Sequence, residues 1–447
     1  MNLTTLAALL RMRSELHSHD RWTRERLLAH QARALAELRA FALARSPFYG
    51  EFHRGLADRP LDELPVLTKA TLMERFDDLV TDREVRLRDV EAHLRRTGPS
   101  DLFRGRYRVA ATAGTTGRRG VFLADPIEWA TVLASYARAN DWAGVPAGLT
   151  QRLRVAVVSS RNPTHQSAIV GATLASRFIP TLRLDAAQPL DEIVVALDAF
   201  RPVSLVGYAS ILRVLADEQL AGRLSIGPRA VMSASEVLTR ETRARIRSAF
   251  GAEPFNVYAA TETAGIASEC RQHLLHLYED LVIAEIVDEE NRPVPPGVFG
   301  SKVLATVLFS RTMPLIRYEI SDRVRPSAEA CPDGLPFALI GAIEGREEDV
   351  LRLAGRDGQP VAIHPNVLHA VLEPVPVAAW QVVQEPGRLR VILVGAGNDV
   401  ADPDIERAVG DALVRAGARE LPVRVERVAA IPRTALGKAP LIRALNT

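Results

Sequence analysis

Short apolar runs alternate with amphipathic segments through the middle of the chain. Four runs have the length and apolar content of buried strands, at 154–159, 204–208, 229–234 and 255–260. Two of the segments between them have helical spacing, at 189–200 and 239–250. Strands separated by helices of this length form right-handed βαβ units and a parallel sheet. The sequence therefore predicts an α/β protein with parallel-rich sheets and flanking helices.

The pattern of apolar and polar residues differs on both sides of this region. A helix is predicted from Thr23 to Ser46, because apolar residues recur at helical spacing and Pro47 closes the segment. After Gly345 a strand, a helix, a hairpin, a second helix and a final strand form a compact α+β tail. We expect two domains, a large one over 1–344 and a small one over 345–447.

Composition excludes several classes of protein. The 56 Lys and Arg residues nearly balance the 54 Asp and Glu residues, which gives a net charge of +2 and no electrostatic reason to expect nucleic acid or an anionic membrane as partner. Two cysteines cannot form a disulfide framework. We find no convincing signal peptide and no run of about 18 apolar residues. The expectation is a cytoplasmic protein.

Lysine is rare in this chain. Only three of the basic residues are lysines, at Lys69, Lys302 and Lys438, and the rest are arginines. Surface positions tolerate the replacement of lysine by arginine, but a site that needs a compact ammonium group does not. Lys438 lies within a conspicuous motif near the C-terminus, whereas Lys69 and Lys302 are interpreted as structural.

Four short motifs carry chemistry. The segment 111–120 packs three glycines and three threonines into a loop after the predicted strand RYRVAA, and such a loop can turn backbone N–H groups toward phosphates. It is not a Walker loop, because Gly-x4-Gly-Lys is absent. The other three motifs follow in order, YAATET at 258–263, MPLIRYEISD at 313–322 with GREED at 345–349, and PRTALGK at 432–438.

Together these motifs resemble the adenylate-forming superfamily, and within it the phenylacetate-CoA ligase branch. The resemblance runs from about Gln31 to the end and includes SPFY at 46–49, LPVLTKATL at 64–72 and SASEVLT at 233–239. It implies a large N-terminal domain that binds ATP and a carboxylic acid, and a mobile C-terminal lid domain. It also implies Mg²⁺ as cofactor and two half-reactions at one site, acyl-AMP formation and transfer to a thiol, most readily that of CoA.

The resemblance assigns roles to individual residues. Residues of the glycine-rich loop would bind the ATP phosphates: Thr112, Gly114, Thr115, Thr116 and Gly117. Residues of four other segments would contact the rest of the nucleotide: Ser235, Glu236, Tyr258, Ala259, Asp322 and Arg346. Glu262 would hold Mg²⁺, Thr261 beside it would be a further catalytic residue, and Lys438 would lie between the carboxylate and the α-phosphate. Catalysis of this kind consists mostly of positioning and charge stabilisation, which an ammonium can provide. Glu348 would be the hinge.

Two further groups of residues are candidates. Cys270, His273, His276 and Cys331 combine thiols and imidazoles at a spacing that suits structural Zn²⁺, with Asp333 or water completing the site. The alternative is two buried thiols and two surface histidines. His165 lies where relatives line the acyl pocket, and Tyr208, at the end of a predicted strand, is also expected to contact substrate.

Three functions stay open at this point. The first is an acid-thiol ligase that acts on a small carboxylic acid and CoA, either as a monomer or as a homodimer. The second is an adenylating enzyme that loads an acyl-carrier protein or forms an amide. The third is a nucleotide-binding regulatory protein without turnover, and the retained Lys438 argues against it.

Overall fold

The computed structural model describes most of the chain, as residues 3–96, 98, 100–112, 119–146, 152–161, 163–186, 188–346, 351–356, 358–363, 365–372, 375–377, 379–397, 400–431 and 441–444. Among these residues, no helix combines the length and the apolar character that crossing a bilayer requires.

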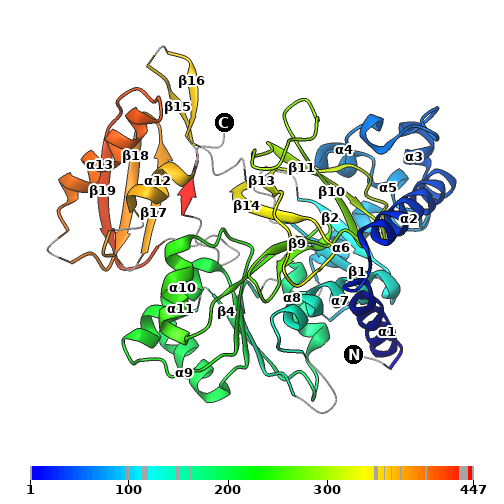
Figure 1. Cartoon of the computed structure of the whole chain (residues 1–447), viewed down its shortest axis with the longest axis horizontal. Coiled ribbons are helices and arrows are strands. Elements are labelled where there is room, and N and C mark those ends of the chain that lie inside the picture. Colours follow the sequence, from blue (N-terminus) through cyan, green and yellow to red (C-terminus); the bar gives the residue numbers. More distant parts are fainter. Residues whose placement is uncertain are drawn as a thin grey trace.

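A nine-stranded mixed sheet forms the centre of the fold (Figure 1). Its strands are β3 (Val155–Ser159), β4 (Thr181–Asp185), β5 (Ser204–Gly207), β6 (Ala230–Ala234), β7 (Phe255–Ala260), β8 (Ala264–Glu269), β9 (Leu275–Leu277), β13 (Asp322–Ser327) and β14 (Leu339–Arg346). The order is β13-β14-β9-β8-β7-β6-β5-β3-β4. The five strands from β7 to β4 are parallel, as predicted, and the other four continue the sheet in antiparallel pairing.

Each parallel strand before β7 is followed by a helix that returns the chain to the same edge. These helices are α8 (Gln166–Leu174), α9 (Leu190–Phe200), α10 (Ala209–Leu220) and α11 (Arg240–Phe250). Buried Leu197, Leu212 and Ile246 belong to the same apolar cluster as Val158 and Leu205 of the sheet. Because parallel strands present their carboxyl ends at one edge, the loops that follow β5, β6 and β7 lie near one another.

The first third of the chain packs against the antiparallel side of the sheet. Its elements are α1 (Leu3–His19), α2 (Arg24–Arg45), α3 (Pro47–Phe52), η1 (Leu61–Glu63), α4 (Lys69–Glu74), α5 (Phe76–Leu79), α6 (Leu87–Leu94), β1 (Arg108–Ala111), β2 (Val121–Ala124) and α7 (Pro126–Trp142). The predicted helix after Thr23 is confirmed as α2, and the Thr23 side chain accepts a hydrogen bond from the Arg26 amide as its N-cap. One hydrophobic core runs from Leu9 of α1 to Ile340 of β14.

A smaller antiparallel sheet shares that core. It comprises β10 (Val282–Val287), β11 (Lys302–Val307) and β12 (Tyr318–Ile320). Tyr318, at the start of β12, is buried and packs edge-on against Phe122 of β2. The sheet therefore fixes the MPLIRYEISD segment, which leads directly into β13.

The C-terminal unit has a core of its own. Its elements are β15 (Leu351–Ala354), β16 (Pro360–Ile363), α12 (Pro365–Leu372), β17 (Ala379–Glu385), β18 (Arg388–Val394), α13 (Asp402–Arg415), β19 (Val423–Val428) and β20 (Ile442–Arg443). Trp380, Val409 and Leu413 are buried in it.

The predicted domain boundary after Glu344 falls inside β14, which continues to Arg346. The buried Arg213 of α10 donates to the carbonyl of Val377 at 3.2 Å, so the two parts of the chain touch.

Candidate active site

A cavity of about 1130 Å³ opens at the carboxyl ends of the parallel strands. It brings together residues that the sequence predicts for the site: Thr112, His165, Tyr208, Ser235, Glu236, Tyr258, Ala259, Thr261 and Asp322. Leu441 and Ile442 of the C-terminal unit also line it. The predicted nucleotide residues, which are spread over more than 200 positions of sequence, therefore surround one space.

Two of the motifs meet through a hydrogen bond. The Tyr258 hydroxyl, near the end of β7, donates to the Asp322 carboxylate at 2.8 Å, and both residues are less than a tenth exposed. Asp322 also pairs with Arg346 in the β13–β14 register, although the Arg346 side chain lies outside the described part of the structure. The carboxylate that is expected to accept ribose hydroxyls is thus held beside the ring that is expected to flank adenine.

The SASEVLT segment turns sharply at the end of β6. Ser235 has φ of 67°, a left-handed conformation that is uncommon for residues other than glycine and that occurs often at functional sites. Glu236 accepts a hydrogen bond from the Ser210 amide at 2.8 Å, in the first turn of α10. The Tyr208 hydroxyl accepts one from the Ser160 amide at 2.9 Å. These contacts tie the loops after β3, β5 and β6 together at the rim of the cavity.

Residues that the sequence analysis missed support the Thr261 and Glu262 loop. Gln166 donates through Nε2 to the Thr261 carbonyl at 3.1 Å and accepts from the Tyr136 hydroxyl at 2.8 Å. The Tyr318 hydroxyl lies 3.5 Å from the Glu262 carboxylate. The position of Gln166 next to the predicted substrate residue His165 was the one sequence feature that could have indicated its role. Tyr136 lies in the middle of α7, and no motif or neighbouring residue indicates a role for it.

The glycine-rich loop is described only at its ends. Thr112 and Gly120 close it, because their backbones pair at 2.9 Å and the Thr112 hydroxyl accepts from the Gly120 amide at 2.8 Å. A side chain at Gly120 would lie 2.9 Å from the Phe122 ring, so any larger residue there would have to displace that ring. The other predicted residues of this loop, Gly114, Thr115, Thr116 and Gly117, lie outside the described residues, as do Lys438 and Glu348.

The two cysteines and one histidine form a compact cluster outside the cavity lining. Ligand atoms of Cys270, His276 and Cys331 all lie within 4.8 Å of one another, and the two sulfurs are 3.9 Å apart. His276 bonds through Nδ1 to the Phe337 carbonyl at 3.1 Å, while its buried Nε2 has no partner. Burial lowers the pKa of His276, which favours the neutral imidazole that binds metals. Burial also affects the Cys270 thiol, whose pKa it raises.

His273, which was predicted as a fourth member, does not join this group. Its ring stacks on Phe255 with centroids 4.5 Å apart, and its Nδ1 lies 3.2 Å from the Glu269 carboxylate. Its backbone is left-handed, with φ of 55°, in the turn between β8 and β9. That turn presents Cys270 and His276 to one another and directs His273 elsewhere, which spacing alone could not reveal.

Comparisons with known proteins bear on the predicted resemblance of the whole chain. No protein-family model matches the chain. A phenylacetate-coenzyme A ligase of Thermus thermophilus is 27% identical over 379 residues, which cover 80% of this chain and 78% of that relative. A second, from Pseudomonas putida, is 29% identical over 277 residues, and the match covers 58% of this chain and 59% of the relative.

Solved structures agree on the fold. A 2-hydroxyisobutyryl-CoA ligase in the postadenylation state, in complex with 2-HIB-AMP, aligns with a TM-score of 0.71 and 19% identity. The alignment covers 95% of this chain and 90% of that one, so it includes the C-terminal unit as well as the large sheet. The sequence comparisons thus support the predicted resemblance to phenylacetate-CoA ligases, and the solved structure confirms the predicted fold of a large α/β part followed by a small C-terminal unit.

Proposed function

We propose that the chain is an ATP-dependent acid-thiol ligase. A carboxylate oxygen attacks the α-phosphorus of ATP, the bond to pyrophosphate breaks, and an acyl-AMP forms. A thiol sulfur then attacks the acyl carbon, and the bond to AMP breaks to release AMP and a thioester. The observation that carries this proposal is the joining of the YAATE and EISD motifs by the hydrogen bond between Tyr258 and Asp322 in one cavity.

The residues around the cavity suit the nucleotide. Tyr258 offers an aromatic face for the base, and Asp322 offers a buried acceptor for hydroxyls. Glu262 supplies the hard oxygen that Mg²⁺ prefers, and a bound ion would neutralise phosphate charge during transfer. The glycine-rich loop and Lys438 complete the proposed set, with Glu348 as the hinge about which the C-terminal unit would rotate between half-reactions.

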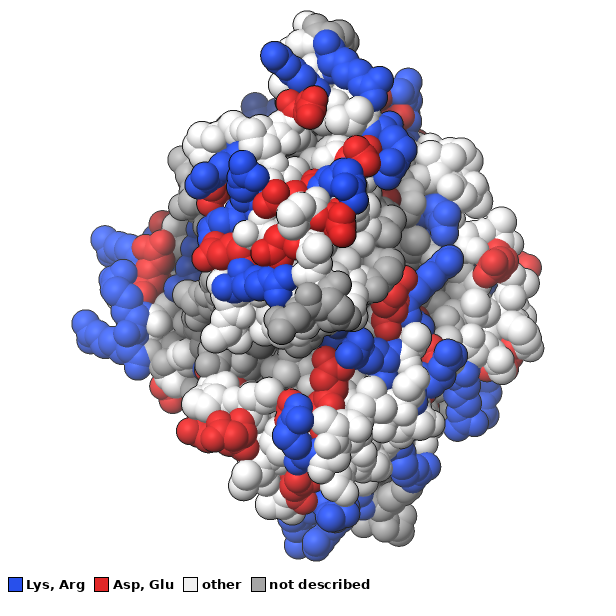
Figure 2. Space-filling model, turned by 90° about the vertical axis from the view of Figure 1, so that its left-hand side faces the viewer, with Lys and Arg blue, Asp and Glu red and all other residues white. Residues whose placement is uncertain are grey.

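CoA is the proposed acceptor, because the curated relatives are named as CoA ligases. Mixed surface charge also disfavours nucleic acid as a partner. Figure 2 shows basic and acidic side chains interspersed on the face formed by the C-terminal unit, where Arg390 pairs with Glu385 and Glu426. The free thiols of Cys270 and Cys331 suit a reducing compartment, so a cytoplasmic location is part of the proposal.

We also propose structural Zn²⁺ at the Cys270, His276 and Cys331 cluster. Two Zn–S bonds of about 2.3 Å at a tetrahedral angle place their sulfurs about 3.8 Å apart, close to the observed 3.9 Å. The orphaned His276 Nε2 provides a third ligand, and its Nδ1 contact to Phe337 fixes the ring as metal-bound histidines usually are. Asp333 is the proposed fourth ligand, with water as the alternative.

Acid-dependent turnover of ATP tests the proposal. Purified chain is incubated with ATP, Mg²⁺ and a panel of aryl, fatty and amino acids, and pyrophosphate release is recorded. Adding CoA should then convert the bound acyl-AMP to acyl-CoA, which mass spectrometry identifies. A carrier-protein or amide-forming enzyme would release pyrophosphate without making acyl-CoA. A regulatory protein would bind ATP and release no pyrophosphate with any acid.

A further inference from the structure

The N-terminal helix α1 forms one wall of the active-site cavity. It precedes the part of the sequence that resembles the family, which begins near Gln31. Leu6, Leu9, Leu10 and Arg13 line the cavity, and their spacing of three, four and seven residues puts them on one face of the helix. The apolar stripe of α1 therefore faces the space that also holds the proposed nucleotide residues.

The opposite walls of this part of the cavity are also apolar. Val170 and Leu174 of α8 line it, as do Leu153, Val155, Phe178 and Ile179 near β3 and the edge strand β4. Val155 and Val157 alternate along β3, so they present one face of the sheet to the cavity. Apolar side chains from α8, the large sheet and α1 thus enclose an apolar extension of the cavity.

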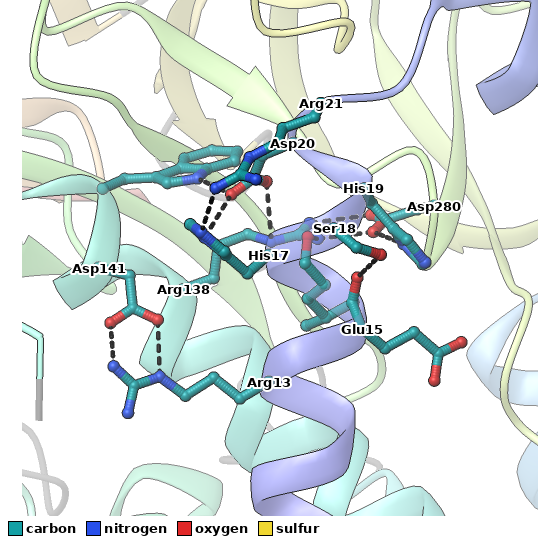
Figure 3. Close-up of polar contacts among 12 residues, drawn as sticks. Arg13, Glu15, His17, Ser18, His19, Asp20, Arg21, Arg138, Asp141 and Asp280 are labelled. Atoms are coloured by element: carbon teal, nitrogen blue, oxygen red, sulfur yellow. Dashed lines mark hydrogen bonds and ion pairs between the residues drawn. The ribbon is translucent and has the colours of Figure 1, made fainter. Parts of the chain in front are cut away.

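Polar contacts along the C-terminal half of α1 hold this wall in place. Arg13 forms a bidentate pair with Asp141 of α7, with N–O distances of 2.8 and 2.5 Å (Figure 3). At the C-terminal end of α1, His19 lies 2.7 Å from Asp280, and Arg138 donates to the same carboxylate at 2.9 and 2.6 Å. Arg138 also donates to the Leu16 carbonyl of α1 at 3.2 Å. These contacts hold α1 in place without a bound ligand, and the charge of Arg13 is neutralised by its ion pair with Asp141.

The apolar extension is continuous with the proposed reaction centre. Gln166 bridges the two regions, because it contacts both the Thr261 carbonyl and the Tyr136 hydroxyl. From Tyr136 the cavity follows α7 to Asp141, five residues or about 7.5 Å along the helix axis. A carboxylate placed near Thr261 would therefore leave room for an apolar tail that runs along α7 toward α1.

We propose that α1 is the distal wall of the acid pocket and that the acid is a monocarboxylic acid with an apolar tail long enough to reach α1. This inference rests on the proposed ligase function and specifies its substrate class. Binding of the tail would remove apolar surface from water, which is worth about fourfold in affinity per buried methylene group. The preferred acid should therefore be a medium-chain or longer alkyl acid.

A steric block at α1 tests this inference. Leu10 is about half exposed, so Leu10→Trp should fold and fill the far end of the extension. We expect KM in acid-dependent pyrophosphate release to rise about tenfold or more for dodecanoate and to change less than about twofold for butyrate. Leu28→Trp on α2 is the matched control, because Leu28 is similarly exposed and does not line the cavity, and its profile should equal that of the native chain.

A second variant and a direct binding measurement separate the outcomes. Leu10→Ala should lengthen the pocket and lower KM for the longest acids. Calorimetry with octanoate alone, without ATP, should show binding to the native chain that Leu10→Trp weakens. If no acid releases pyrophosphate but octanoate binding depends on Leu10, the ligase function fails and the pocket stands. If acids are activated but neither Leu10 variant alters the chain-length profile, the α1 pocket is wrong and the ligase stands.

Discussion

The Tyr258 hydroxyl donates a hydrogen bond to the Asp322 carboxylate across 64 positions of sequence. The contact couples the end of β7 to the start of β13, and it helps to orient the Asp322 carboxylate. Because both groups are buried, the loss of either one leaves the other without this partner.

Removal of the Tyr258 hydroxyl should weaken nucleotide binding. A hydrogen bond to a charged group contributes about 1.5 to 3 kcal/mol, so Tyr258→Phe should raise KM for ATP about tenfold or more. The matched control is Tyr107→Phe, because Tyr107 donates the same kind of bond to Asp82 at 2.7 Å and neither residue lines the cavity. That control should change the melting temperature alone. Equal effects of both variants on KM would show that the contact at Tyr258 is only structural.

Metal removal should destabilise the chain. We expect about one zinc per chain in protein purified without chelator, and a lower melting temperature after chelation, because metal binding is linked to folding. His276→Ala and Cys331→Ser should abolish zinc content, whereas His273→Ala should retain it, since His273 lies against Phe255 and Glu269. A native preparation without zinc, or zinc that is lost in His273→Ala and kept in His276→Ala, would overturn the assignment.

The buried ion cluster of His19, Arg138 and Asp280 should be essential for stability. Burial alone would raise the pKa of Asp280, but the charge and hydrogen bonds of Arg138, with those of His19, outweigh this effect and hold it well below its ordinary value. Arg138→Met leaves that carboxylate buried and without its main partner, which should cost about 3 to 5 kcal/mol in free energy of unfolding.

The double variant of this pair is its internal control. Combining Arg138→Met with Asp280→Leu replaces both charges by apolar groups, and urea titration should show that most of the stability returns. If the single variant unfolds at the native urea concentration, the ion cluster is not what anchors α1.

Stability should also fall at mildly acidic pH because of His53. Burial, with a contribution from the Arg39 charge, lowers the pKa of His53 from 6.5 to about 4. Between these values the unfolded chain binds a proton that the folded chain does not, so the free energy of unfolding should decrease as pH falls from about 6.5 to about 4. The loss from this group is at most about 3 kcal/mol. His53→Gln should flatten this profile of unfolding free energy against pH.

The parallel half of the fold was predictable because its signals are local. Six of the nine elements between Val155 and Ala260 were predicted, with bounds that differ by at most about one residue, whereas α8, β4 and α10 were not predicted. The antiparallel arrangement of β8, β9 and β14 was not predicted, because strand pairing joins segments that are distant in sequence and no local pattern specifies it. Most of the proposed site was predictable because its residues lie in motifs.

The supporting contacts could not be predicted from sequence. Gln166 bonds to Thr261 across 95 positions, and Arg13 pairs with Asp141 across 128. No periodicity or motif links such distant residues, so the wall that α1 contributes to the cavity became apparent only from the structure. The assignment of His273 failed for the same reason, since the turn that excludes it is a matter of backbone conformation.

The central claim is that Lys438 serves adenylation at this cavity, and its direct test is a comparison of the two half-reactions in Lys438→Ala. The account predicts that the variant loses acid-dependent pyrophosphate release by about a hundredfold or more, because stabilisation specific to that transition state is lost. Supplied with a synthetic acyl-adenylate and CoA, it should still form much of the native amount of thioester. Pyrophosphate release by Lys438→Ala at a near-native rate would contradict the account.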